Sequence, residues 1–314
     1  MSELRNLRLD SNKLTEVPTE AFEYLSSLEA LYLKRNQISV IHDDAFSNLT
    51  SLRVLELDDN LLTHIPIALT KLTALQEFDM KLNNLKQVPD LSGCKDLRVL
   101  DLAGNKIKSL EGKLFQGLNL MHDLLLSKNE ITKIPRDAFY GLSKLQVLDL
   151  ESNTISDVHS EAFTHFNQLE DLNLGNNIFP TLPTDGLDRL LHLKTFNNPK
   201  LRSFPSPDKF PRVQSLVLSY AYHCCAFLPL IPVEPPPRTP VHESVLFPTD
   251  NEFDMSLWNS SLTDIWPQLR KSFFDLILEC NKQTKKSVIQ ILGCESNIIA
   301  EERGLEVRIA AFEA

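Results

Sequence analysis

The sequence predicts a solenoid of the α/β class, a horseshoe whose concave face is one parallel β-sheet, followed by a Pro-rich hinge. Three observations support this prediction. A unit of 22 to 24 residues, Leu-x-x-Leu-x-Leu-x-x-Asn-x-Leu, recurs eight times in succession. A second apolar pattern, built around Phe, lies between these units. Seven prolines stand within residues 228–250, directly after the units end.

Each unit predicts one short strand on the concave side. The leucines of the Leu-x-Leu core point into the solenoid, and the residues beside them point outward. The Asn stands where the chain leaves the strand, and its amide can satisfy backbone groups that the turn buries. A period of this length is typical of stacked units, here a leucine-rich repeat array. The units begin at Leu4, Leu28, Leu52, Leu75, Leu97, Met121, Leu145 and Leu169.

The convex half of the array carries the Phe pattern. We expect these rings to stack in a second buried column. Repeats three and four lack the Phe and carry Ile65-Pro66 and Val88-Pro89 instead, with shorter units after them, so we expect a local change of curvature there. The Phe positions of the other repeats include Phe22, Phe46, Phe139 and Phe163.

The repeat pattern weakens after the eighth unit. A ninth unit opens at Leu193, which places Asn198 at the inner strand position and Leu201 at the Asn position. A tenth opens at Val213. The array is therefore expected to hold about ten repeats and to need a cap at its end.

Three regions are expected along the chain. They are the repeat array with a Cys-Cys cap at residues 1–227, a Pro-rich, acidic hinge at 228–270, and a short helical tail at 271–314. Within the tail, Phe273–Leu278 and Val288–Leu292 predict two short helices. No cap precedes the first unit, so we expect upstream repeats and a signal peptide to be missing from this chain.

Five cysteines leave at least one unpaired within the chain. Cys94 is expected to be a buried small hydrophobic residue. The disulfide candidates, whose connectivity cannot be read from sequence, are Cys224, Cys225, Cys280 and Cys294. Glycosylation sequons stand at Asn48 and Asn259.

The charge of the chain is acidic, with 32 Lys and Arg against 42 Asp and Glu, for a net −10. This balance argues against nucleic acid as a partner, because phosphate neutralisation needs clustered basic residues. It suits a basic partner instead. No apolar stretch is long enough to span a membrane, which takes about 18 residues.

Most of this charge is expected on the concave face. Of the 24 positions that flank the inner leucines of the eight units, three are basic, namely Arg8, Lys34 and Lys81. Ten are acidic, which gives the face a net charge of −7: Asp10, Glu56, Asp58, Glu77, Asp79, Asp101, Asp123, Asp149, Glu151 and Asp171. We predict that this face, with Tyr32 and Asn173 as specificity contacts, binds a basic protein. An ordinary polar, solvated strand face is the alternative.

Sequence signatures of catalysis are missing. We find no Gly-rich phosphate loop, no metal-ligand spacing among the eight histidines and no nucleophile motif. The sequence therefore predicts neither an enzyme nor a cofactor or metal site.

The end of the array carries a family resemblance. The string Tyr220-Ala221-Tyr222-His223-Cys224-Cys225-Ala226-Phe227 resembles the C-terminal cap signature of the leucine-rich-repeat-containing G-protein-coupled receptors. Its Ala-Tyr form is most similar to the branch that holds the R-spondin receptors and the insect bursicon receptor.

The resemblance implies the ligand-binding part of a plasma-membrane receptor on its extracellular side. Ligands of this family are R-spondins or cystine-knot hormones such as bursicon, bound on the concave face. The hinge then couples binding to a seven-helix domain, which acts on a G protein and does not follow in this chain. Two alternatives stay open: a soluble, secreted repeat protein that sequesters the same ligand, and an intracellular scaffold.

Overall fold

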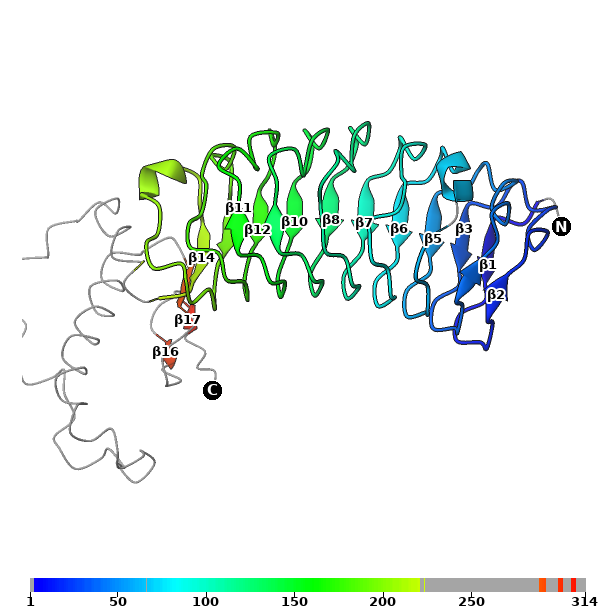
Figure 1. Ribbon diagram of the computed structural model, residues 1–314, viewed down its shortest axis with the longest axis horizontal. Helices are drawn as coiled ribbons and strands as arrows, with labels where there is room; N and C mark the ends of the chain where they lie inside the picture. The colour runs from blue at the N-terminus through cyan, green and yellow to red at the C-terminus, as the bar shows by residue number, and fades with distance from the viewer. Residues whose placement is uncertain are drawn as a thin grey trace, which may run out of the picture.

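A computed structural model describes residues 3–65, 67–220 and 223, together with the backbone of three short strands further along the chain. The chain winds into an elongated solenoid with one strand per turn (Figure 1). These strands form a single parallel sheet, which confirms the predicted class. In order across the sheet they are β1 (Asn6–Arg8), β3 (Ala30–Tyr32), β5 (Val54–Glu56), β6 (Glu77–Asp79), β7 (Val99–Asp101), β8 (Asp123–Leu125), β10 (Val147–Asp149), β12 (Asp171–Asn173), β13 (His192–Lys194), β14 (Ser215–Leu218) and β15 (Val288–Ile291).

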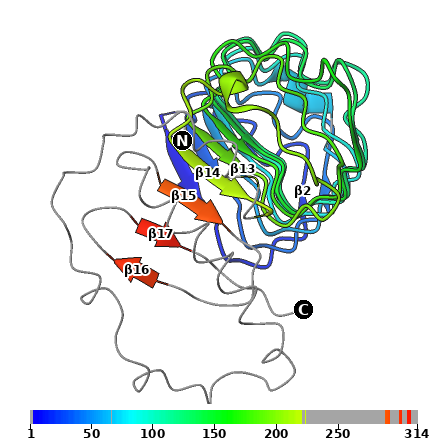
Figure 2. The same cartoon turned by 90° about the vertical axis from the view of Figure 1, so that its left-hand side faces the viewer.

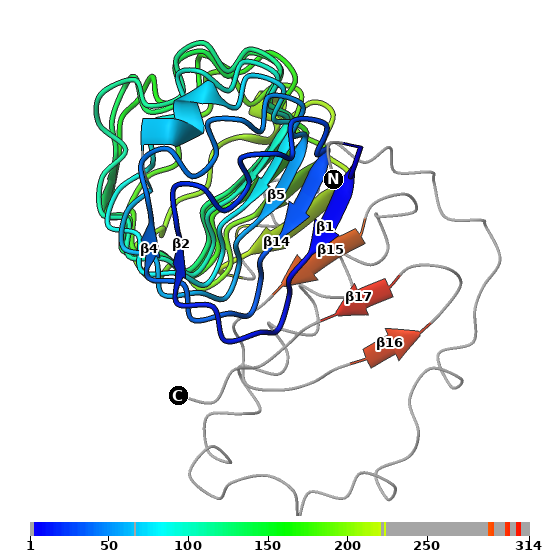
Figure 3. The ribbon, with the colours of Figure 1, turned by 90° about the vertical axis from the view of Figure 1, so that its right-hand side faces the viewer.

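The opposite wall of the coil holds little regular structure. Seen from the N-terminal end, β2 (Glu16–Val17) and β4 (Val40–Ile41) face β1 and β5 across the coil (Figure 3). A second pair on that wall joins β9 (Lys133–Ile134) to β11 (Asp157–Val158). Among the described residues the helical segments are two 3-10 turns, η1 (Ile67–Lys71) and η2 (Pro207–Lys209). None of these helices is long and apolar enough to cross a membrane.

The core is a continuous stack of leucines. The central leucine of each strand pairs in register with that of the next, as Leu31 does with Leu55. Both are fully buried, whereas Leu4 in the first repeat is 39% exposed. Burying a leucine contributes about 1.5–3 kcal/mol. Stacking between repeats therefore stabilises strands that are only three residues long.

An asparagine ladder runs beside this core, as the sequence predicts. The Nδ2 of Asn60 donates to the carbonyl oxygens of Leu33 and Leu57, each at 3.0 Å, while its Oδ1 accepts from the backbone N–H of Ile38 at 3.0 Å. One amide thus joins two repeats. The same pattern holds at Asn36, Asn83, Asn105, Asn129, Asn153 and Asn177.

The convex Phe column is present and interrupted where the sequence predicts. Phe22 stacks on Phe46, and Phe139 on Phe163, each with ring centroids 6.3 Å apart. In repeats three and four, buried Leu69, Leu91 and Cys94 stand in the core instead. The turns of these two repeats lie close to each other. A Cβ added to Gly93 would lie 1.6 Å from the carbonyl oxygen of Thr70, which leaves no room for a side chain.

The ninth repeat corrects one prediction. Leu193 pairs with Leu172, so it is the central strand leucine and not the first of its unit. Thr195, fully buried, takes the inner strand position, and Asn198 takes the Asn position. Asn198 donates to the carbonyl oxygens of Leu174 and Thr195 at 3.0 and 2.8 Å, as the other ladder residues do. The prediction failed because a threonine at a leucine position hides the motif.

The tail corrects another prediction. Val288–Ile291 is a strand, β15, which pairs in parallel with β14 (Figure 2). Its β-branched residues favour a strand, and the open edge of the sheet supplies its partner. An antiparallel pair, β16 (Ile299–Glu301) and β17 (Glu306–Arg308), follows. The other predicted helix at Phe273–Leu278, the hinge and both region boundaries lie outside the described residues.

Candidate ligand-binding face

The register of the sheet arranges the outward side chains in three rows. The middle row lies at the last residue of each of the first nine strands of the sheet and runs through Arg8, Tyr32, Glu56, Asp79, Asp101, Leu125, Asp149, Asn173 and Lys194. The first row lies two residues earlier and holds Glu77, Asp123 and Asp171 among Val54, Val99 and Val147. The third row lies two residues after the middle row and holds Asp10, Lys34, Asp58, Lys81 and Glu151. All eleven candidate residues therefore share one face.

The middle row has a structural role that the charge pattern alone does not reveal. Oδ1 of Asp101 accepts a hydrogen bond from the backbone N–H of Ala103 at 3.0 Å, and Oδ1 of Asp149 accepts from Glu151 at 3.1 Å. Such turns close the end of each strand. Asn173 makes the same bond to Gly175 at 3.1 Å, so the turn needs the oxygen and not the charge.

Lys34 and Lys81 of this face are engaged with its carboxylates. Lys34 Nζ lies 2.7 Å from Glu56 Oε2. Lys81 Nζ lies 2.5 Å from Asp79 Oδ2 and 3.7 Å from Asp101 Oδ2. The hydrogen bond to Glu56 raises the pKa of Lys34 above its ordinary value. Burial alone would lower the pKa of Lys81, but the carboxylates of Asp79 and Asp101 outweigh it.

The N-terminal end of the face carries a cation–aromatic contact. The guanidinium carbon of Arg8 lies 4.0 Å above the centre of the Tyr32 ring, and Nη1 of Arg8 lies 3.6 Å from Asp10 Oδ2. Tyr32, the predicted specificity contact, is thus partly covered by Arg8.

The carboxylates crowd most closely in repeats three to five. Asp58 is only 7% exposed, and its Oδ1 is buried without a hydrogen-bond partner among the described residues. Burial, reinforced by the negative charge of Asp79, raises the pKa of Asp58. Burial also raises the pKa of Asp101, against the opposing hydrogen bond from Ala103.

The other predicted specificity contact belongs to an amide cluster at the far end of the face. Nδ2 of Asn173 donates to Glu151 Oε2 at 2.8 Å, and Nδ2 of Asn176 donates to Glu151 Oε1 at 3.2 Å. Asn197 extends the cluster to the next repeat with a 2.7 Å bond to Asn176 Oδ1. Glu151 is therefore held in place by neutral partners.

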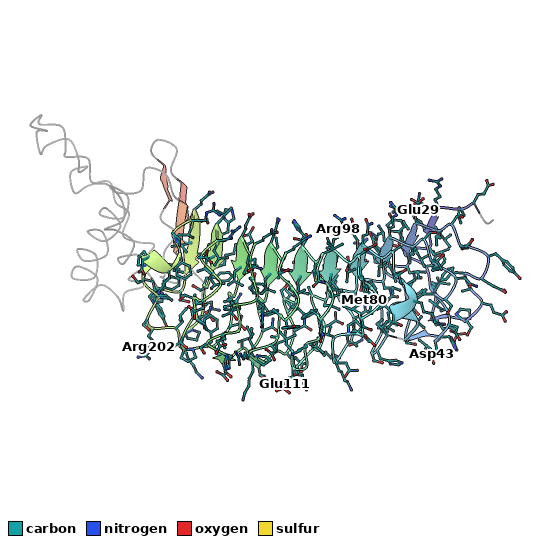
Figure 4. All side chains as sticks on the ribbon, turned by 90° about the horizontal axis from the view of Figure 1, so that it is seen from above. Glu29, Asp43, Met80, Arg98, Glu111 and Arg202 are labelled. Carbon is teal, nitrogen blue, oxygen red and sulfur yellow. The ribbon has the colours of Figure 1, made fainter. Side chains whose placement is uncertain are left out.

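Sequence reasoning missed a row of arginines at the rim of the face. Arg5, Arg53 and Arg98 stand immediately before their strands and are exposed. Figure 4 shows Arg98 and Glu29 on the side of the strands, with Asp43 and Glu111 on the far side. The available signal was a basic residue two positions before the middle leucine of a strand. The charge count from the sequence covered only the positions that flank the inner leucines and so left these arginines out.

The remaining candidates divide between described and undescribed residues. Asn48 is exposed, and its Nδ2 donates to the carbonyl oxygen of Glu23 at 3.2 Å. Cys94 is fully buried and unpaired, as predicted, and burial raises the pKa of its thiol to about 12. Asn259 and the four disulfide candidates lie outside the described residues. Within the described part of the chain, no three His, Cys, Asp or Glu side chains gather to hold a metal ion.

Stacked parallel strands, an asparagine ladder and a polar concave face define a leucine-rich repeat protein. The family described as "Leucine rich repeat" matches residues 2–62, 31–85, 50–107, 91–131 and 121–179, which together span more than half of the chain. The chain therefore belongs to this family.

Among curated proteins, the chain is similar to leucine-rich repeat-containing G-protein coupled receptors, as its cap string indicates. It is 53% identical over 133 residues to receptor 4 of Bos taurus, covering 42% of this chain and 14% of that protein. It is 42% identical over 173 residues to receptor 5 of Homo sapiens, covering 47% and 19%. It is 30% identical over 157 residues to receptor 5 of Rattus norvegicus, covering 50% and 15%. The chain thus spans less than a fifth of these relatives.

Solved structures show the same fold. The TLR13–ssRNA13 complex matches with a TM-score of 0.64 and 27% identity, covering 69% of this chain and 32% of that one. An octameric complex of Latrophilin 3, Unc5D and FLRT2 matches with a TM-score of 0.57 and 27% identity, covering 63% and 62%. These likenesses support a receptor ectodomain or protein-binding role for the repeats.

Proposed function

We propose that this chain belongs to the extracellular, ligand-binding region of a plasma-membrane receptor of the hormone type. Its concave face binds a basic secreted protein. The main support for this proposal is the charge of that face. Ten carboxylates stand in three adjacent rows, and the three basic residues among them already form ion pairs with carboxylates of the face. Such a surface attracts a positively charged ligand and raises its rate of association.

The family resemblance narrows the ligand class to R-spondins or cystine-knot hormones such as bursicon. A hinge after the repeats would couple binding to a seven-helix domain, and only that domain would reach a G protein. The net charge of −10 favours a protein ligand over RNA, although one structural neighbour is an RNA complex, because carboxylates repel phosphates.

The test measures binding of the chain to R-spondin and to the bursicon heterodimer, side by side, at about 50 and 300 mM NaCl. We expect one ligand to bind and its affinity to fall at the higher salt, because exposed charges are screened there. Failure of both ligands with folded protein would contradict the ligand assignment.

A charge variant then tests the face itself. Asp101→Asn combined with Asp149→Asn removes two charges and keeps the turn that Asn173 makes naturally. We expect a severalfold loss of affinity and a weaker salt dependence. The matched control is Asp43→Asn with Glu111→Gln, which removes two charges on the side away from the strands (Figure 4). Equal effects of the two double variants would contradict a concave binding face.

Glycosylation of Asn48 in cells tests the extracellular assignment. Asn48 is exposed in a sequon, so expression through the secretory pathway should add a glycan that Asn48→Gln abolishes. An unmodified Asn48 in secreted protein would count against this assignment.

A further inference from the structure

One residue of the middle row breaks the pattern of its neighbours. In repeats four, five, seven and eight, the side-chain oxygen at this position accepts a hydrogen bond from the backbone N–H two residues later, at 3.0 or 3.1 Å. The residues that do so are Asp79, Asp101, Asp149 and Asn173. Repeat six has Leu125 there, which has no oxygen to offer. The chain therefore gives up, at this one point, a bond that closes the turn in the repeats on either side.

Leu125 also places hydrocarbon on a polar face. Alternation along the strand buries Leu124 and Leu126 in the core and turns Leu125 outward, where it is partly exposed. It stands in register with Asp101 on one side and with Asp149 on the other. Both the missing bond and the exposed apolar surface are costs to the fold. Departures from local rules of this kind are expected at functional positions.

Further apolar side chains adjoin Leu125. Val99 and Val147 stand in the first row on the strands to either side, in register with the residue two positions before Leu125. Neighbouring strands about 4.8 Å apart, with a rise of about 3.3 Å per residue, put each valine roughly 8 Å from Leu125, diagonally across the face. Ala103 and Ser127 hold the third-row positions of repeats five and six and are too small to cover it. Val99, Leu125 and Val147, all partly exposed, thus form an apolar patch.

Carboxylates border the apolar patch. Asp101 and Asp149 flank Leu125 at about 10 Å from each other, across two strand spacings, and Asp123 lies between the two valines. Each flanking aspartate uses its Oδ1 for a turn. Asp149 has no ion pair among the described residues, and the ion pair of Asp101 with Lys81 is long, at 3.7 Å. Charge complementarity therefore favours an apolar side chain with basic neighbours, and it disfavours a second copy of a chain whose net charge is −10.

We propose that the apolar patch is the anchoring subsite of the concave face and takes an extended segment of the protein ligand that runs across the strands. An apolar side chain of this segment lies on Leu125, and basic side chains two positions before and after it pair with Asp101 and Asp149. Positions i−2, i and i+2 of an extended segment share one face and span about 13 Å, which long basic side chains can match to the two carboxylates. This inference rests on the proposed function and specifies where and how the ligand is held.

The experiment uses the full chain and two capped pentapeptides, Lys-Ser-Leu-Ser-Lys and Lys-Ser-Ser-Ser-Lys, which differ only in the central side chain. Titrations followed by NMR of the leucine methyl groups give both the affinity and the place of binding. We expect the Leu peptide to bind at least about threefold more tightly than the Ser peptide, with the largest shift at the methyls of Leu125. Asp101→Asn with Asp149→Asn should weaken both peptides to a similar extent.

Leu125→Asn tests the residue without disturbing the turn, because Asn173 occupies the same position two repeats further along. We expect this variant to lose the preference for the Leu peptide. Its thermal midpoint of unfolding, Tm, should stay within about 4 °C of wild type, since the new amide can accept the N–H of Ser127. Leu125→Ile should keep the preference. The matched control Leu61→Asn, which alters an exposed leucine outside the three rows, should keep it as well.

Equal affinity of the two peptides for the wild-type chain, the same result for Leu125→Asn and Leu61→Asn, or a largest shift at another leucine would each overturn the subsite. A fall in the Tm of Leu125→Asn by more than about 4 °C would do the same, because Leu125 would then serve the packing of the fold. Repeating the variants with R-spondin and the bursicon heterodimer separates the two proposals. Salt-sensitive binding that Leu125→Asn leaves unchanged supports the acidic face and excludes this subsite. A peptide preference that depends on Leu125, without binding of either protein, supports the subsite and excludes these ligands.

Discussion

Aspartates of the middle row accept the hydrogen bond that closes a turn and also carry a negative charge. One substitution separates these two roles. Asp149 closes its turn through a bond that Asn173 makes with an amide oxygen. We therefore predict that Asp149→Asn leaves Tm nearly unchanged, whereas Asp149→Leu loses about 1 kcal/mol of unfolding free energy. Urea denaturation of both variants checks this. Equal destabilisation by Asn and Leu would mean that the charge itself holds the turn.

The crowded carboxylates should make stability depend on pH. Folding raises the pKa of Asp58 and Asp101, so the folded chain binds these protons more tightly than the unfolded chain. The unfavourable contribution of each group is absent below its unfolded pKa and grows as pH rises through the folded pKa. We predict that Asp58→Asn gains stability over wild type at pH 7, and that the gain shrinks toward about pH 4. Urea denaturation across this range measures it, and a gain independent of pH would contradict the assignment.

Cys94 should be chemically silent in the folded chain. Its side chain is fully buried, its Sγ hydrogen-bonds to the Leu69 carbonyl oxygen at 3.4 Å, and its pKa is raised to about 12. Both effects remove the reactive thiolate at neutral pH. We predict that iodoacetamide modifies Cys94 only after denaturation, as followed by mass spectrometry of its peptide. Rapid modification under native conditions would show that the turns of repeats three and four open.

At the level of the repeat, the asparagine ladder should contribute more to the free energy of unfolding than any single strand. Asn105 donates to the carbonyl oxygens of Met80 and Leu102 and accepts from the N–H of Leu85, all at 3.0 Å. Removing the amide leaves these buried groups unsatisfied. We predict that Asn105→Ala costs on the order of 3 kcal/mol of unfolding free energy. The control Asn12→Ala, where the amide is exposed and bonds only within its own repeat, should cost far less in the same urea titration. Equal costs would contradict the ladder's role between repeats.

The elements that sequence predicts well are those whose packing repeats. Leucine and asparagine spacing places the strands and the ladder, because each position meets the same neighbours in every turn. Thr195 takes a position that holds an apolar residue in the preceding repeats. The register there becomes visible only through the pairing of Leu193 with Leu172 and the hydrogen bonds of Asn198. Strand β15 depends on pairing with β14, more than 70 residues earlier, which no local pattern contains. The candidate face follows from alternation along the strand, but the pairing of Lys81 and the isolation of Asp58 depend on contacts between repeats.

Across the whole molecule, the acidic face does not extend to the end of the array. Repeats three to eight carry nine of its ten carboxylates, whereas the ninth strand presents His192 and Lys194 at the equivalent positions. In a repeat array each turn contacts only its neighbours, so such a gradient of charge is possible without a change of fold. A basic ligand would thus be oriented along the solenoid as well as attracted to it.

The same charges should give stability and binding opposite responses to salt. In the free chain, carboxylates in adjacent strands repel one another and the net charge is −10, so screening should stabilise the fold. With a basic ligand, screening removes attraction instead. We predict that raising NaCl from about 50 to 300 mM increases the Tm of the free chain while it weakens ligand binding. Asp101→Asn with Asp149→Asn should reduce both responses, and the control Asp43→Asn with Glu111→Gln should reduce neither. If the salt response of Tm were unchanged in the first double variant, the repulsion that lowers stability would lie outside the concave face. The salt dependence of Tm and that of ligand binding would then have separate origins.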